Sequence, residues 1–337
     1  MSNSIYPENF DGNIMTSRVR IARNFWGYPF KINDAATSQK VVSKVCDALN
    51  RCDEFDVFYL SDKTDIQLEA MKEKHLISQA LIDNKQFGAV LISKDESVSV
   101  MVNEEDIIRQ QCFMKGLRVF EAYKKLDRID DELSKNFNFA YDDDWGYLTA
   151  CPTNVGTGLR ASVMLFLPAL TISGKIERII ERETAAGLTV RGAYGEGSAA
   201  EGYVYQLSNE ITLGIGEQDI LKTVEEATLK VCEEERKELD RLVEKQELLM
   251  MDKAKKSYGV LTNAVMLGYE EFLGHIGNVK LGAMLGMLNI NDLSEIDDLT
   301  TSVRPALLGA KRKSHATYGQ DVYRAELVKN RLKKLEE

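Results

Sequence analysis

The sequence of 337 residues contains few of the side chains from which metal and disulfide sites are built. It has three histidines, and no two of its cysteines form a CxxC pair; they are Cys46, Cys52, Cys112, Cys151 and Cys232. We therefore expect no protein-bound metal. An odd number of scattered cysteines fits a reducing compartment better than a disulfide framework, which predicts a cytoplasmic protein.

Long apolar runs and an excess of positive charge are also missing. No apolar run reaches the ~18 residues that a membrane-spanning helix needs, and residues 1–11 are polar and acidic, which is not typical of a secretory signal. The formal net charge of −10 argues against direct nucleic-acid binding. With 44% hydrophobic and 28% charged residues, the composition is typical of a globular protein, and the length predicts two domains.

Residues 17 to about 215 mix strand and helix patterns. Val98, Val100 and Val102 alternate with other residues, which is the period of a half-buried strand. Other strand-length apolar runs are Asp56–Leu60, Gly88–Ile92, Ser162–Leu167 and Tyr203–Leu207, and helical patterns occupy Gln67–Leu81 and Gly116–Asp127. Because strands and helices do not alternate strictly, we expect an α+β domain with a largely antiparallel sheet flanked by helices.

From Glu217 onward the pattern becomes helical. Ile220, Leu221, Val224 and Val231 recur at helical spacing within a charged stretch, and few strand signals follow. We predict a first domain over residues 1–224 and an all-helical C-terminal domain over residues 225–337, joined inside or beside a long helix.

The usual nucleotide-binding signatures are missing, because the chain has no GxxxxGK[ST], HRD or DFG motif. Arginines recur instead beside glycine-rich or acidic segments. In Ser17–Asn24, Arg18 and Arg20 are two residues apart, so on an extended segment both side chains point to one face. A solvated edge strand would explain the same pattern.

Three further blocks follow along the chain. Asn103–Arg109 places three acids after a strand, which by itself is also typical of a capped helix start. Cys151–Ser162 combines a cysteine, a proline, two glycines and Arg160; a tight loop with an inert cysteine is the alternative. Arg191–Ser198 places an arginine five residues before Glu196, although a glycine-bearing hairpin would look similar.

These blocks, SRVR, NEED followed by Arg109, CPTNxGTGxR and RG, resemble the motifs of the guanidino-phosphotransferase superfamily, which includes creatine and arginine kinases, and they occur in its order. Glu73–Ser78, the YGEGS core of Arg191–Ser198, Tyr205–Asn209 and the helical tail resemble its protein-arginine kinase (McsB) branch. The resemblance covers nearly the whole chain. It implies ATP-dependent phosphorylation of arginine side chains in proteins.

The resemblance also implies roles for individual residues. Glu105 and Glu196 would hold the acceptor guanidinium and take its proton, in an order that the sequence does not assign, and Cys151 would tune activity as a thiolate. ATP with Mg²⁺ would be the donor, and His75 would lie against the adenine, although a histidine in a helix is often structural. The expected nucleotide-site residues are Ser17, Arg18, Val19, Arg20, His75, Arg109, Arg160, Ala161, Ser162, Val163, Met164, Arg191, Gly192, Ala193, Tyr194 and Gly195.

The tail departs from the branch. Protein-arginine kinases carry an RDxxRA motif, interpreted as a phosphoarginine pocket linked to allosteric self-activation. The corresponding residues here are Gln320, Asp321, Arg324 and Ala325, so a neutral amide replaces the first arginine and weakens the pull on a phosphoryl group. Alternatively, Asp321 simply begins a final amphipathic helix and Arg324 is exposed.

The resemblance further implies partners: arginine-bearing protein substrates, an activator protein, a stress-response repressor, the Clp protease machinery, and a second copy of the chain bound through the helical domain. Two alternatives remain. The chain could phosphorylate a small free guanidine, or it could be a non-catalytic adaptor. Glu105 and Glu196, kept together with all the phosphate arginines, disfavour the adaptor.

Overall fold

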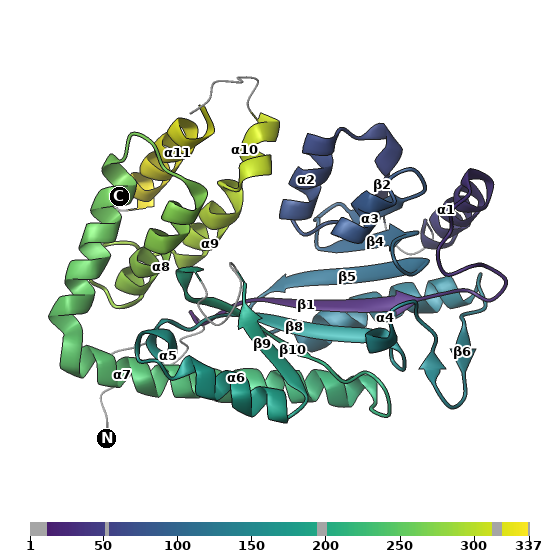
Figure 1. Ribbon diagram of the computed structural model, residues 1–337, viewed down its shortest axis with the longest axis horizontal. Helices are drawn as coiled ribbons and strands as arrows, with labels where there is room; N and C mark the ends of the chain where they lie inside the picture. Colours follow the sequence, from purple (N-terminus) through teal and green to yellow (C-terminus); the bar gives the residue numbers. More distant parts are fainter. Residues whose placement is uncertain (1–11, 51–53, 194–200, 312–318, 336–337) are drawn as a thin grey trace.

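The computed structural model describes residues 12–50, 54–193, 201–311 and 319–335. Within these ranges an eight-stranded sheet has the order β2-β3-β4-β5-β1-β8-β10-β9, and its neighbouring strands are antiparallel (Figure 1). Its strands are β1 (Ile14–Arg23), β2 (Phe55–Tyr59), β3 (Ala89–Ser93), β4 (Val98–Val102), β5 (Ile108–Lys115), β8 (Leu159–Phe166), β9 (Leu188–Gly192) and β10 (Val204–Asn209). The predicted α+β fold with a largely antiparallel sheet is confirmed.

The strand β1 lies inside the sheet, between β5 and β8. Arg18 pairs with Phe113 on one side and Ser162 on the other, and Arg20 pairs with Gln111 and Arg160. The segment is therefore an interior strand and not the solvated edge strand that its sequence also allowed. Because side chains alternate along a strand, Arg18 and Arg20 share one face of the sheet.

The opposite face of the sheet carries the main hydrophobic core, which includes Val19, Ile21, Ala161 and Val163. Helices cover this face: α1 (Ala35–Leu49), α4 (Val119–Ser134), α5 (Pro168–Ile172), α6 (Ile176–Ala185) and the first part of α7 (Glu217–Asn263). In α4 the buried residues recur every three or four positions, as expected for a helix with one apolar face; they are Val119, Ala122, Tyr123, Leu126, Ile129, Asp130 and Leu133.

The helices α2 (Asp65–Glu73) and α3 (Gln79–Asp83) pack against β3 and β4 through Leu68, Leu81 and Ile92. The sequence predicted one helix over Gln67–Leu81, and this prediction is wrong. The helix is interrupted because His75 adopts a left-handed conformation with φ of 60°. Ser78 then caps the start of α3 by accepting a hydrogen bond from Leu81 N.

The helix α7 connects the sheet to the C-terminal helices α8 (Tyr269–Met284), α9 (Leu293–Ser302), α10 (Pro305–Lys311) and α11 (Gly319–Leu335). It is interrupted at Gln246, where φ is −140° and ψ is 23°. Beyond this break, Leu261 joins Phe272, Leu299 and Val328 in a second core. The domain division expected after residue 224 lies inside α7 and stays a prediction.

Here "the C-terminal helices" denotes α8 to α11 with the part of α7 after Gln246. A cluster containing Phe166, Leu239, Leu242 and Leu281 packs them against the sheet. They also approach it at a second place, where α10 lies beside α2 (Figure 1). The remaining elements are the hairpin β6 (Tyr141–Asp142) and β7 (Gly146–Tyr147) and the short 3₁₀ turns Leu60–Asp62, Pro152–Asn154 and Glu201–Tyr203. Among the described residues, no helix is both long and apolar enough to span a membrane.

Candidate active site

Arginines from four strands converge on the sheet face that the main core leaves open. Arg18 and Arg20 come from β1, Arg109 from β5, Arg160 from β8 and Arg191 from β9. Burial, followed by the charges of Arg109, Arg160 and Arg191, lowers the pKa of Arg18 to about 10. Burial and the charges of all four others lower the pKa of Arg20 well below its usual value. The five guanidinium groups are therefore close enough to repel one another.

This cationic group has too few partners of its own. Among the described residues, Arg109 alone of the five has a carboxylate within ion-pair distance, that of Glu104. The Nε–H donors of Arg20 and Arg160 are buried and, within the same ranges, have no hydrogen-bond acceptor. Buried donors without acceptors are costly, so the arrangement fits a multiply charged anion that would satisfy them.

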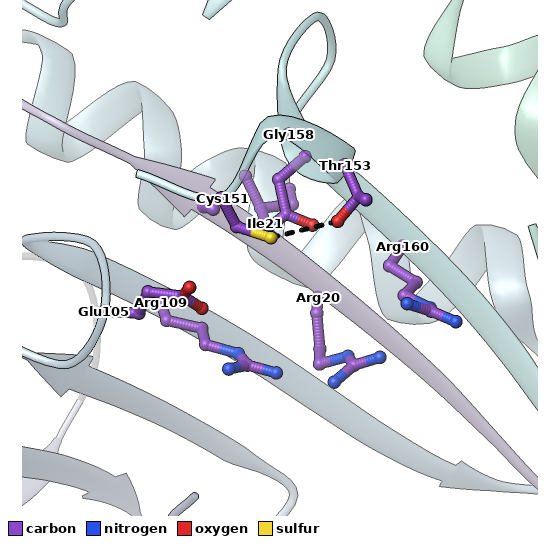
Figure 2. Close-up of a pocket in the computed structure, with 10 residues that line it drawn as sticks. Arg20, Ile21, Glu105, Arg109, Cys151, Thr153, Gly158 and Arg160 are labelled. Carbon is purple, nitrogen blue, oxygen red and sulfur yellow. Dashed lines mark hydrogen bonds between the residues drawn. The ribbon is translucent and has the colours of Figure 1, made fainter. Parts of the chain in front are cut away.

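A cavity beside these arginines is lined by residues from the segments Asn103–Arg109 and Cys151–Ser162. It is lined by Arg20, Arg109 and Arg160 together with Glu105 and Cys151. Figure 2 shows the guanidinium groups of Arg20, Arg109 and Arg160 on one side of the strands, with Glu105 next to Arg109. The structure thus brings Glu105, Cys151 and three of the arginines together. Glu196, Tyr194 and Gly195 lie outside the described residues.

The turn carrying Glu105 is held by buried acids that the sequence analysis did not single out. Asp106 accepts hydrogen bonds from Asn24 Nδ2 at 2.7 Å and from Ala150 N at 2.6 Å. Burial raises the pKa of Asp106. Glu104 is 2% exposed and binds Arg109 and Ser78. The acidic segment is therefore a turn between β4 and β5 and not the start of a helix. Glu104 and Asp106 hold Glu105, which lies between them, in position.

The loop carrying Cys151 is held equally firmly. Gly156 has φ of 110°, and a Cβ atom there would lie 2.2 Å from Thr212 O, so only glycine fits. Buried Arg23 donates to Thr157 O at 2.8 Å and lies 3.4 Å from the ring centroid of Tyr147. The Cys151 sulfur is 3.1 Å from the Thr153 hydroxyl (Figure 2). The sequence showed the special residues of this loop but not the arginine that fixes it.

A larger cavity of about 530 Å³ continues along the same sheet face. Arg18, Phe113 and His75 line it, and the His75 and Phe113 rings are stacked with centroids 5.8 Å apart. The His75 ring is open to this cavity, yet partial burial and the charges of Arg304 and Arg18 lower its pKa. It is therefore neutral at neutral pH and presents a flat surface suited to a base.

The other predicted nucleotide residues fall into three groups. Ser162, Met164 and Ala193 line the larger cavity. The side chains of Val19, Ala161 and Val163 belong to the core on the opposite face, and the buried Ser17 donates to Gly116 O at 2.7 Å. These four side chains line neither cavity, because they occupy the alternate positions of their strands. Gly192 ends β9 beside Ala193.

The tail residues are arranged differently from an open phosphoarginine pocket. Arg324 is 2% exposed and donates to Val303 O at 3.0 Å, Leu267 O at 2.7 Å and Asp321 Oδ1 at 2.6 Å. Gln320 is exposed, and Ala325 is buried in the second core. Arg324 is therefore not exposed, although one of the two sequence interpretations expected it to be. Its donors are directed at protein oxygens, so it is not available to bind a phosphoryl group, although the other interpretation expected this.

Comparisons with known proteins agree with these features. The family model "ATP:guanido phosphotransferase, C-terminal catalytic domain" matches residues 37–238, and "Protein-arginine kinase McsB C-terminal domain" matches residues 247–337. The protein-arginine kinase of Caldanaerobacter subterraneus subsp. tengcongensis is 39% identical, with 96% of this chain and 98% of the relative covered. That of Clostridium acetobutylicum is 40% identical, with 94% and 91% covered.

Solved structures give the same fold. The duplicated taurocyamine kinase from Schistosoma mansoni, with bound transition-state analogue components, has a TM-score of 0.60 and 28% identity over 70% of this chain and 34% of its own. Lombricine kinase has a TM-score of 0.59 and 25% identity, with 69% of this chain and 68% of its own covered.

Proposed function

The chain belongs to the protein-arginine kinase family and is a kinase, and from this premise we propose that it transfers the γ-phosphoryl group of ATP to arginine side chains of other proteins. The observation that carries the proposal is the open sheet face on which five arginines converge beside Glu105. Permanent cations suit a triphosphate, and two of these arginines keep buried N–H donors without acceptors in the described part of the chain.

In this proposal the arginines position the donor and stabilise its charge. Phosphoryl transfer depends mainly on positioning and electrostatics, so preorganised guanidinium groups can replace a P-loop lysine. The smaller cavity would take the transferring group, and the larger one the base and ribose. Mg²⁺ would accompany ATP; because the described residues contain no cluster of three or more His, Cys, Asp or Glu suited to an ion, it would be held largely by phosphate oxygens and water.

The acceptor is a guanidinium group, which is a poor nucleophile until it loses a proton. As its N–H proton passes to a carboxylate, a nitrogen–phosphorus bond forms and the γ-phosphorus–oxygen bond to ADP breaks. We propose that Glu105 and Glu196 hold the planar fork and that one of them takes the proton. Cys151, in the same cavity as Glu105, would stabilise the positive charge of the acceptor.

We further propose cytoplasmic protein substrates, among them a stress-response repressor and proteins destined for Clp proteolysis, and regulation by an activator protein. The net charge of −10 disfavours direct contact with nucleic acid. A homodimer through the C-terminal helices is supported by exposed apolar side chains on α7 and in the segment between α7 and α8, Leu248 and Val265 being 79% and 80% exposed. Sedimentation of the full chain tests the dimer, and a monomer at all concentrations would exclude it.

Mass spectrometry at neutral or basic pH tests the activity. An arginine-rich protein incubated with the chain and MgATP should acquire acid-labile phosphoramidates on arginine. Glu105→Gln should lower kcat at least about 100-fold, the scale of a general base, whereas Glu96→Gln, an exposed control, should not. Turnover of free L-arginine without protein modification would favour the small-guanidine kinase. Absence of both would favour the adaptor.

A further inference from the structure

The larger cavity has walls from both parts of the molecule. Arg18, His75 and Phe113 come from the sheet and its attached helices, whereas Thr301 and Arg304 come from the C-terminal helices. In Figure 1, α10 lies beside α2 at the edge of this region. The C-terminal helices therefore contribute directly to the space that the proposed function assigns to the nucleotide base and ribose.

Arg304 joins the two walls. Its Nη1 atom donates to Glu73 O at 2.5 Å and lies 3.2 Å from His75 Nε2. A guanidinium group has donors only, so Nε2 of His75 must be the acceptor. The neutral ring then carries its proton on Nδ1. Arg304 thus fixes both the orientation and the tautomer of the histidine that faces the cavity.

Glu73 makes the return contact. Its carboxylate accepts hydrogen bonds from Ala306 N at 2.9 Å and Leu307 N at 2.8 Å, at the start of α10. The end of α2 is therefore fastened to the C-terminal helices in both directions. His75 lies two residues after Glu73 with φ of 60°, a conformation that is uncommon for residues other than glycine.

An ion pair between a buried lysine and a half-buried aspartate closes the cavity at another side. Lys280 is 4% exposed, and its Nζ atom is 2.6 Å from Asp297 Oδ1. Both residues line the cavity, and Lys280 also lies 4.8 Å from the ring centroid of Phe166 on β8. A lysine charge buried against the sheet is tolerated only with a well-placed partner, so the contact with Asp297 holds this wall in position.

We propose that Arg304 is a positioning residue of the nucleotide site, and that α9 and the turn leading from it to α10 form a wall of this site. Nucleotide binding and docking of the C-terminal helices then strengthen each other, because a ligand that contacts both walls favours the docked arrangement and is favoured by it. The inference rests on the proposed function, since it identifies the ligand of the larger cavity as a nucleotide.

Arg304→Gln tests the inference, with Arg331→Gln as the matched control. Arg331 is an exposed arginine of the C-terminal helices that pairs with Glu295 away from the cavity. We expect Arg304→Gln to raise the Kd for ADP about tenfold, the scale of a lost hydrogen bond to a charged group. KM for ATP should rise more than kcat falls, and the control should remain within about twofold of the wild type.

A spectroscopic measurement separates positioning from a general loss of stability. The chain has three histidines, so ¹⁵N shifts of the ring nitrogens can be assigned. The wild type should show His75 protonated on Nδ1, and Arg304→Gln should shift it toward the Nε2–H form. In addition, ADP should slow amide exchange in α9 and α10 of the wild type and have a smaller effect in the variant.

A second variant guards against misfolding of the first. Thr301→Phe places bulk into the cavity from α9 and should weaken ADP binding at least about tenfold without changing the His75 tautomer. Wild-type ADP affinity in both Arg304→Gln and Thr301→Phe would overturn the inference and leave the proposed kinase function intact. Failure of the wild-type chain itself to bind ADP would instead overturn the proposed function.

Discussion

Asp106 and Ala150 are joined by a 2.6 Å hydrogen bond that fastens the turn carrying Glu105 to the loop carrying Cys151. The same carboxylate oxygen also accepts from Asn24, at the end of β1. One buried carboxylate therefore holds together two segments that are about forty residues apart in the sequence, and both segments line the smaller cavity.

Replacing Asp106 should separate these two segments. Asp106→Ala removes the acceptor shared by Ala150 N and the buried Asn24 amide, so it should cost about 1–3 kcal/mol of unfolding free energy and lower kcat in the folded fraction. Asp106→Asn retains an acceptor oxygen and should cost less. Urea unfolding and phosphoryl transfer measure the two effects. An equally stable Asp106→Ala variant would show that the bond does not hold the site.

The repulsion among the arginines predicts opposite effects of one substitution on the free and the bound protein. Arg20→Gln removes a buried charge that four neighbours disfavour, so the nucleotide-free protein should be stabilised by about 1 kcal/mol, or about 2–4 °C in Tm. The increase in Tm on adding ADP should shrink. Differential scanning fluorimetry measures both, with the exposed Arg178→Gln as the control. If Arg20→Gln instead lowered the Tm of the nucleotide-free protein, repulsion among the five arginines of the open sheet face would be contradicted.

A buried glutamate predicts how stability depends on pH. Glu235 of α7 accepts hydrogen bonds from Ala169 N and Leu170 N, and burial raises its pKa from 4.5 to about 8. Between these values the folded state holds a proton that the unfolded state has released. Its contribution to stability is therefore complete below pH 4.5 and is lost as the pH rises through about 8.

Comparison with Glu235→Gln isolates this contribution. The unfolding free energy of the wild type minus that of the variant should decrease between about pH 5 and pH 8 and then become constant. Chemical denaturation at intervals across pH 5–9 provides the measurement. A difference that does not vary with pH would show that Glu235 is ionised throughout this range in the folded protein.

The glycines with positive φ predict unequal costs for the same substitution. Gly27→Ala introduces a Cβ atom with no neighbour within 4 Å, so only backbone strain of about 1 kcal/mol is expected. Gly156→Ala places that atom 2.2 Å from Thr212 O and should cost at least about 3 kcal/mol, with a lower kcat because the Cys151 loop must move. Equal costs in unfolding experiments would mean that the loop adapts freely.

The sequence predicted the fold because it contains strong periodic signals. The alternating residues Val98, Val100 and Val102 lie in β4, although this strand is buried on both faces and not half-buried as the alternation predicted. The pattern after Glu217 matches the long helix. The prediction failed at Gln67–Leu81 because the apolar spacing there continues across His75. The left-handed turn at His75 is imposed partly by Gln111, whose side chain donates to His75 O at 2.5 Å from a distant strand. A local pattern contains no trace of such a contact.

The site shows the same division. The sequence motifs predicted that arginines and acidic residues would lie close together in one site. The two-residue spacing of Arg18 and Arg20 predicted that their side chains would lie on the same face of a strand. Nothing in the motif told Glu105 from its neighbours except the family resemblance, since Glu104 and Asp106 are also acids. The positions of these two acids depend on distant contacts. Glu104 accepts a hydrogen bond from Ser78, 26 residues away, and Asp106 accepts one from Ala150, 44 residues away. Arg304, more than 200 residues from His75, could not have been placed without the fold.

The interruption of α7 at Gln246 has a practical consequence for work on separated halves. Leu239 and Leu242, just before it, are covered in part by Met250 and Leu281, which come after it. A fragment ending near Gln246 would keep all the described arginines of the cationic face but would expose this apolar strip to water. Such a truncated enzyme would tend to self-associate, so assays of the isolated sheet would report on aggregation as much as on catalysis.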